Sequence, residues 1–289
     1  MEESYHPYPK VKYHNNIHAA DVMHSTHVLL KNVAFYGAFS DLEIFAAIIA
    51  GAVHDCSHPG RTNAFLIKTS NNLAMLYNDI SVLENFHLAT AFRIMTEDPD
   101  CNILANFSSE EKLVVRKLMI DMVLSTDMAK HTKFLGEFKQ LSKNLHGDPD
   151  ATPDGDRPES VMAQLRNNYS DRTLVLCTIV HNADLGNPTK EWEICKEWTE
   201  RLMEEFFEEG DEERAMGLPL GALNDRDAIA IPKCQIGFLS FVAMPLWKAW
   251  DDYLTAPHTQ DKTIQLTHLE KNLAKWEALA SLVDNCSPA

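Results

Sequence analysis

The chain has 289 residues, and its 42 acidic side chains outnumber its 26 basic ones, giving a formal net charge of −16. A balance this acidic argues against binding to nucleic acid or to an anionic membrane surface. Hydrophobic residues make up 45% of the sequence and glycine occurs only 11 times. This composition excludes a disordered or fibrous chain and is typical of a packed globular protein.

The sequence has no segment typical of membrane insertion or secretion. Its longest apolar run, residues 44–53, is about half the ~20 residues that a membrane-spanning helix needs. The six cysteines show neither close pairs nor metal-type spacing, which favours free thiols in a reducing compartment. We therefore expect a soluble, cytoplasmic protein.

Helical periodicity dominates the sequence and strand-like alternation is scarce, so the predicted class is all-α. The predicted helices are, in chain order, residues 16–31, 41–53, 81–95, 109–130, 161–181, 191–209, 236–253 and 262–283. Asp41 and Ser109 are the expected N-caps of the second and fourth helices. Glu84 stands at the capping-box position relative to Ser81.

Residues 143–160 are expected to form an exposed loop, because they hold three prolines, two glycines and five acids. Chemistry-bearing residues lie on both sides of this loop, which favours a single helical domain over residues 1–289. They also begin by position 14, which suggests a catalytic region cut from a longer chain whose regulatory regions are not present.

The residues that carry chemistry are histidines and aspartates near predicted helix ends. His14 and His18 are four residues apart, His54 and Asp55 end an apolar helix, and Asp184 ends another. Any one of these residues alone is more often a partner of the helix dipole or a core residue than a ligand. Together, two histidines and two carboxylates in the order H…HD…D suit a divalent metal centre.

Seven segments identify a family resemblance. They are YHNNIHAADVMHSTH, HDCSHPG, YNDISVLENFHLA, STDMAKH, HNADLGNPTK, WTERLMEEFFEEGD and QIGFLSFVAMPLW. In this order, over residues 13–250, they resemble the catalytic domain of class I cyclic-nucleotide phosphodiesterases, and most closely its cAMP-hydrolysing members. The resemblance implies a compact, multi-helix catalytic domain with Zn²⁺ and a second ion, usually Mg²⁺, in a deep pocket.

The same resemblance assigns roles to individual residues. It implies zinc ligation by His18, His54, Asp55 and Asp184, with Asp55 also reaching the Mg²⁺, for which Mn²⁺ is an expected substitute. His58, His87, Thr126 and Glu84 are expected to hold waters or steady the ligands. His14 is expected to be the general acid, hydrogen-bonded to Glu84.

The resemblance also implies a pocket for the purine base. The expected substrate-binding residues are Tyr13, Asn187, Leu202, Phe206, Gln235 and Phe238. Helical spacing alone favours a core position for Phe206 and Phe238. Two departures from the family pattern are Cys195, where many relatives carry an aromatic residue, and Phe86, which replaces the first His of a frequent ENHH.

The function implied is hydrolysis of 3',5'-cyclic nucleotides to 5'-monophosphates by a metal-bridged hydroxide, with cAMP preferred and cGMP a possible second substrate. An alternative is an HD-type phosphohydrolase acting on another nucleotide or phosphate ester, which does not explain Gln235 and Phe238. A non-catalytic nucleotide-binding module would be expected to lack a ligand or His14. The sequence leaves open the choice between cAMP and cGMP, the second metal, and whether the protein is a monomer or a homodimer.

Overall fold

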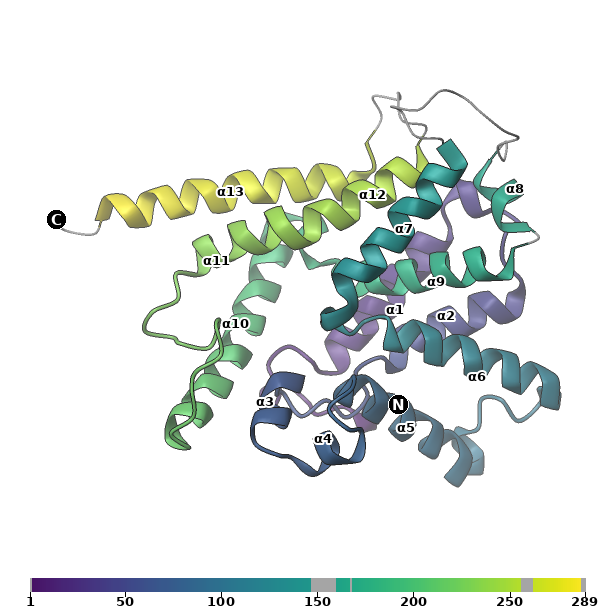
Figure 1. The fold of residues 1–289 in the computed structure, drawn as a ribbon, viewed down its shortest axis with the longest axis horizontal. Helices are drawn as coiled ribbons and strands as arrows, with labels where there is room; N and C mark the ends of the chain where they lie inside the picture. The colour runs from purple at the N-terminus through teal and green to yellow at the C-terminus, as the bar shows by residue number, and fades with distance from the viewer. Residues whose placement is uncertain (1, 147–159, 167, 256–261, 287–289) are drawn as a thin grey trace. The chain divides into compact units, whose positions relative to one another are not determined.

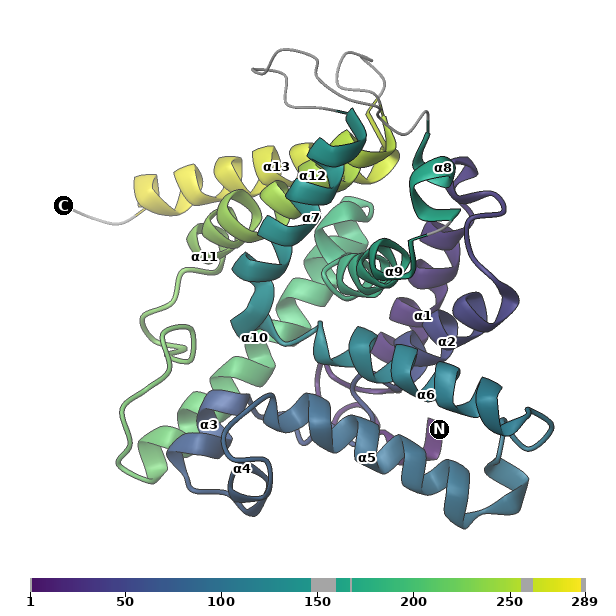
Figure 2. The ribbon, with the colours of Figure 1, turned by 45° about the vertical axis from the view of Figure 1, so that its right-hand side comes forward.

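The computed structural model describes residues 2–146, 160–166, 168–255 and 262–286. Over these residues the chain forms helices and no strand, so the predicted all-α class is confirmed (Figures 1 and 2). None of the described helices combines the length and the apolar character that crossing a membrane requires. The internal contacts divide the chain into two units, Met1–Asp184 and Leu185–Ala289, which we describe separately. The single domain over the whole chain stays a prediction.

The first unit is built from nine described helices. They are α1 Asn16–Leu30, α2 Asp41–Val53, α3 Asn63–Lys68, α4 Asn72–Leu76, α5 Val82–Glu97, α6 Ser109–Leu124, α7 His131–His146, α8 Val161–Arg166 and α9 Tyr169–Asp184. Short 3-10 turns lie at Glu2–Ser4, Val33–Phe35, Pro99–Cys101 and Met128–Lys130. The predicted loop over residues 143–160 begins later than expected, since α7 continues to His146. Most of that prediction, residues 147–159, lies outside the described residues.

The predicted helix 109–130 is shorter than expected and is followed by a helix that the sequence analysis missed. It ends at Leu124 because the hydroxyls of Ser125 and Thr126 donate to the carbonyls of Met122 and Val123. Such side-chain bonds offer the backbone an alternative to the helical ladder. The chain then turns and continues as α7, and the short helices α3 and α4 were also not predicted.

The N-caps of α2 and α6 lie one residue earlier than predicted. Ser40 and Ser108 are the caps, and each forms a capping box with the glutamate three residues later, Glu43 and Glu111 respectively. Asp41 and Ser109 are instead the first residues of their helices. Asp41 was mistaken for a cap because the helix dipole also favours an acid in the first helical turn, and Ser109 because it is the second of two adjacent serines.

The core of the first unit forms where α2 packs against α1, α6 and α9 (Figures 1 and 2). A glycine on α2 allows the close approach of α1, because a Cβ at Gly51 would lie 3.0 Å from Thr26 Oγ1 and 3.3 Å from Met23 Cα. A partly buried ion pair joins the start of α2 to α9, with Arg172 Nε 2.7 Å from Glu43 Oε1. These contacts hold together the three helices that carry the candidate metal ligands.

The second unit consists of α10 Trp192–Ala215, α11 Ile231–Phe238, α12 Met244–Leu254 and α13 Ile264–Cys286, with a 3-10 turn at Asn187–Thr189. A π-helical turn, Leu239–Ala243, joins α11 to α12. α11 and α12 lie alongside α13 (Figures 1 and 2). Asn272 of α13 donates to the carbonyls of Pro188 and Lys190, both at 2.8 Å, and so fixes the turn that contains Asn187.

Two glycines in helices are expected to respond oppositely to replacement by alanine. A Cβ at Gly210 would overlap the backbone oxygen of Asn224, and that segment is held by hydrogen bonds from the Asn224 amide to Glu209 and Glu213. Gly210→Ala should therefore cost about 1 to 3 kcal/mol of unfolding free energy, as overpacking does. Gly136→Ala, with nothing within 4 Å of the new atom, should gain about 0.5 to 1 kcal/mol from helix propensity. Urea denaturation measures both values, and effects of the same sign would contradict the close packing at Gly210.

Candidate metal centre

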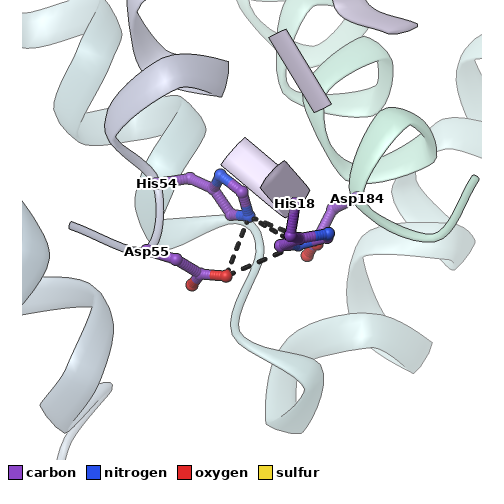
Figure 3. Close-up of side chains that lie close together, drawn as sticks. All are labelled: His18, His54, Asp55 and Asp184. Atoms are coloured by element: carbon purple, nitrogen blue, oxygen red, sulfur yellow. Dashed lines mark hydrogen bonds and ion pairs between the residues drawn. The ribbon is translucent and has the colours of Figure 1, made fainter. Parts of the chain in front are cut away.

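Four donor atoms from three helix ends converge in the first unit (Figure 3). His18 lies near the start of α1, His54 and Asp55 follow the last residue of α2, and Asp184 ends α9. Asp184 Oδ1 is 3.1 Å from His18 Nε2 and 3.3 Å from His54 Nε2. Asp55 Oδ2 is 3.1 Å from His54 Nε2 and 3.5 Å from His18 Nε2. The structure thus brings together the four predicted zinc ligands.

The His54 ring presents a lone pair to this cluster. Its Nδ1 lies 2.9 Å from the carbonyl oxygen of Gly51 and can only donate there, which leaves Nε2 of the neutral ring without a proton. His54 Nε2 is also 3.2 Å from His18 Nε2. Two imidazole nitrogens at this distance, both facing carboxylates, are arranged as ligands of a shared cation.

The spacing of the donors fits a tetrahedral ion. Ligand bonds of about 2.0 to 2.1 Å place tetrahedral donors about 3.3 to 3.4 Å apart. Five of the six separations between these donors run from 3.1 to 3.5 Å. Two nitrogens and two oxygens at this spacing fit Zn²⁺.

The charges of the cluster also require a cation. Both histidines are buried, and with neutral rings the two carboxylates leave a charge of −2 that needs compensation. Burial alone would lower the pKa of His54, but the charges of Asp55 and Asp184 outweigh it and raise that pKa well above 6.5. At His18 burial dominates and the pKa is lowered. A divalent ion would supply the compensating charge without a proton.

A second group of donors lies beside the first and shares Asp55 with it. Asp55, His58 and His87 form this group, and His87 Nε2 is 3.7 Å from Asp55 Oδ1. His87 Nδ1 donates to the Cys56 carbonyl at 2.7 Å, so its Nε2 carries a lone pair, and this atom has no hydrogen-bond partner among the described residues. Burial lowers the pKa of His87 to about 4, and the ring is neutral at pH 7.

The ring of His58 is oriented so that its Nε2 can donate a hydrogen bond. The backbone N–H of Gly60 donates to His58 Nδ1 at 3.0 Å, so the proton of the neutral ring is on Nε2. A ring in this tautomer can hold a water but cannot bind a metal through Nε2. This geometry supports the predicted role of His58 as a residue that holds waters.

The ring of His14, the predicted general acid, is held between aromatic neighbours. It stacks on His58 with ring centroids 4.0 Å apart and an angle of 19°. Tyr13 packs edge-on against it at 4.7 Å and also contacts His18 at 4.5 Å. Tyr13 is buried, and its predicted contact with substrate stays a prediction.

Glu84 lies at the start of α5 but does not belong to a capping box. Ser81 is in the left-handed region with φ 44° and makes no capping bond; its hydroxyl instead donates to Asp127 Oδ2 at 2.6 Å. Glu84 accepts both hydrogen bonds from Asn63 Nδ2, at 3.1 and 3.2 Å. Asn63 was missed by the sequence analysis, because an asparagine at a helix start usually caps its own helix. The hydrogen bond between His14 and Glu84 stays a prediction.

Thr126 is placed by the turn after α6. It is buried, and its hydroxyl donates to the Val123 carbonyl at 2.8 Å. The oxygen keeps its lone pairs for a further partner. Its predicted role beside the ions remains a prediction.

Five of the predicted base-pocket residues lie in the second unit. Gln235 of α11 is buried and accepts a hydrogen bond from the Thr199 hydroxyl of α10 at 3.4 Å. Leu202 and Phe206 follow Thr199 on α10, and Phe238 lies one turn after Gln235. Leu202, Phe206, Phe238 and Asn187 are only partly buried. The two phenylalanines are thus not fully buried core residues, and their predicted contact with the base stays a prediction.

The two departures from the family pattern are accommodated by packing. Cys195 is buried on α10, and burial raises the pKa of its thiol to about 11, so the thiol is neutral and fills space as a small apolar group. Phe86 packs beside His87, with ring centroids 5.8 Å apart. His87 itself keeps its place in the second donor group.

The pKa of Glu84 yields a test of the site. Burial raises it from 4.5 to about 7, with a further contribution from Asp127. Between pH 4.5 and about pH 7, Glu84 binds more protons in the folded protein than in the unfolded chain. Rising pH therefore lowers the free energy of unfolding in this range. In chelated protein, Glu84→Gln should thus be more stable than the unchanged chain at pH 8, by roughly 3 kcal/mol at most, and similar to it at pH 4.5. Urea denaturation at both pH values measures this, and a difference that does not vary with pH would contradict the shift.

Comparison with known proteins gives a consistent result. The family model of 3'5'-cyclic nucleotide phosphodiesterase matches residues 13–266. The chain is 44% identical over 288 residues to the 3',5'-cyclic-AMP phosphodiesterase 4C of Rattus norvegicus, covering 100% of this chain and 50% of that protein. It is 43% identical over 263 residues to the probable 3',5'-cyclic-AMP phosphodiesterase pde-4 of Caenorhabditis elegans, covering 90% and 37%.

A solved structure agrees. The phosphodiesterase domain of the Salpingoeca rosetta rhodopsin phosphodiesterase superposes with a TM-score of 0.84 at 32% identity, covering 98% of this chain and 79% of that one. The chain spans half or less of the length of the curated relatives that it matches. Sequence and structure together show that the chain belongs to the 3'5'-cyclic nucleotide phosphodiesterase family.

Proposed function

We propose that this chain hydrolyses 3',5'-cyclic AMP to 5'-AMP with two divalent ions. The observation that carries the proposal is the set of four converging donor atoms, His18 Nε2, His54 Nε2, Asp55 Oδ2 and Asp184 Oδ1. Membership of the family and the cAMP-specific names of the relatives support the substrate.

Two ions fit the donors. His18, His54, Asp55 and Asp184 would hold Zn²⁺, and Asp55, which belongs to both donor groups, would share in holding Mg²⁺ or Mn²⁺. Few protein ligands serve the second ion, which suits Mg²⁺ because it keeps several of its waters. When bound, the ions neutralise the phosphate charge and supply a nucleophile from water near neutral pH.

The protein residues handle the proton and the orientation of the reacting groups. Hydrolysis joins the water oxygen to phosphorus and breaks the bond from phosphorus to the 3' oxygen, which then needs a proton. His14 is proposed to donate that proton, with its ring held by Tyr13 and His58. His58 Nε2–H and the lone pair of His87 Nε2 are suited to orient waters beside Asp55.

Selectivity for the base is proposed to reside in the second unit. Gln235 can meet adenine or guanine, since an amide both donates and accepts. The Thr199 hydroxyl can likewise donate to the amide oxygen or accept from its nitrogen, so it supports either orientation of Gln235. The preference for cAMP therefore rests on the relatives, with cGMP as a second substrate to be tested.

The proposal is tested by incubating purified protein with cAMP or cGMP and separating the products by chromatography. We expect 5'-AMP as the main product, loss of turnover on chelation, and recovery on addition of Zn²⁺ with Mg²⁺. Asp184→Asn keeps the shape of the side chain but removes one charge from the zinc ligands, and should lose bound zinc and turnover together. Binding of cAMP without turnover would favour a binding module, and hydrolysis of other phosphate esters alone would favour an HD-type phosphohydrolase.

The role of His14 as general acid is tested by changing the leaving group of the substrate. His14→Ala should lower kcat for cAMP by ~10² to 10⁴, the contribution of a general acid, with metal content unchanged. The 3'-thio analogue of cAMP has a leaving sulfur that needs little protonation, so the variant should lose much less activity on it. An equal loss on both substrates would contradict the assignment.

A further inference from the structure

The segment Glu2–Tyr5, here called the N-terminal strap, packs against the end of α2 and the turn that follows it. The candidate metal ligands His54 and Asp55 lie in this turn. Glu2–Ser4 form a 3-10 turn, and Tyr5 is buried in the main core of the first unit. The turn, Ala52–Ser57, contains His54 and Asp55. None of the strap residues has a role in the function proposed above.

The Tyr5 hydroxyl is placed at the end of α2. It donates to the Ala52 carbonyl at 3.0 Å, one of the last four carbonyls of the helix, which have no partner within it. Ala52 precedes Asp55 by three residues, so this bond fixes the last turn of the helix directly before the shared ligand.

Two further contacts join the strap to the same turn. The Ser57 hydroxyl donates to the Ser4 carbonyl at 2.8 Å, and the Ser4 hydroxyl lies 3.1 Å from Cys56 Sγ. Ser57 is in the left-handed region with φ 63°, a conformation that a non-glycine residue holds only with support from its surroundings. The hydrogen bond between Ser57 and Ser4 supplies part of that support, two residues after Asp55.

The orientation of the Asp55 carboxylate affects both donor groups, whereas a ligand to a single ion affects only one. Its Oδ2 faces His54 and His18, and its Oδ1 faces His87. A small rotation of the Asp55 backbone would move both oxygens and so disturb both donor groups. Second-layer groups that orient ligands in this way are worth about 10- to 100-fold in metal affinity or activity.

We propose that Tyr5 is a positioning residue that aims Asp55 through its backbone. This inference rests on the proposed function, because it assigns Asp55 to both ions. Tyr5 does not touch the ions or the substrate.

The test compares Tyr5→Phe, which removes only the hydroxyl, with Tyr8→Phe as the matched control. Tyr8 lies in the same segment but is 54% exposed. Zinc affinity is measured by titration against a chelating dye and Mg²⁺ affinity by the activation of hydrolysis. For Tyr5→Phe we expect about tenfold weaker affinity for at least one ion, a lower kcat at subsaturating Mg²⁺ that excess Mg²⁺ restores, and an unchanged KM for cAMP. Tyr8→Phe should behave as the unchanged chain does.

Thermal unfolding of the chelated proteins separates positioning from simple stability. Loss of stability in Tyr5→Phe with unchanged metal affinity and kcat would overturn the proposal. If Tyr5→Phe does not fold, Ser57→Ala, which removes a strap contact outside the core, decides by the same measurements and should weaken metal binding. If the unchanged chain binds zinc but does not hydrolyse cAMP, the proposed function fails, while the zinc affinities of the variants still decide the role of Tyr5.

Discussion

The first unit depends on bringing the carboxylates of Asp55 and Asp184 within 3.5 Å of two buried imidazoles. Such an arrangement is unfavourable in a protein interior unless a cation balances it, since separated charges lose their hydration there. The fold must therefore hold the donors in place before an ion binds. The close packing of α1 on α2 at Gly51 and the partly buried ion pair from Arg172 to Glu43 hold the helices that position them.

Asp55 links this centre to the surrounding hydrogen bonds. One oxygen of its carboxylate faces His54, and the other faces His87. The ring of His87 is fixed by its hydrogen bond to the Cys56 carbonyl. The same short turn accepts the Tyr5 hydroxyl at Ala52. Because the turn is stabilised from two sides, the orientation of Asp55 is determined by the backbone around it more than by its own side-chain preferences.

The second unit buries an amide and leaves two aromatic rings partly exposed. Gln235 is buried but supported by the Thr199 hydroxyl, so its amide is not left without a partner. Phe206 and Phe238 stay partly exposed, whereas the neighbouring Phe207 is in the core. Adjacent residues on a helix point about 100° apart, so Phe206 and Phe207 face different surroundings.

The sequence by itself determined the all-α class, the order of most helices and the four metal-ligand candidates, because helical periodicity and the H…HD…D pattern are local signals. Its errors have two causes. Ser81 and Glu84 have the spacing of a capping box, yet they bond to Asp127 and Asn63, which lie far from them along the chain. The helix expected to reach residue 130 ends at Leu124 for a local reason, the bonds of the Ser125 and Thr126 hydroxyls to nearby carbonyls. Only the tertiary structure decided that Asp55 meets His18 and His87 and that the Tyr5 hydroxyl reaches the end of α2. The carbonyl of Ala52 is a backbone group, which is the same at every position of a sequence, so only the fold determines that Tyr5 bonds to it.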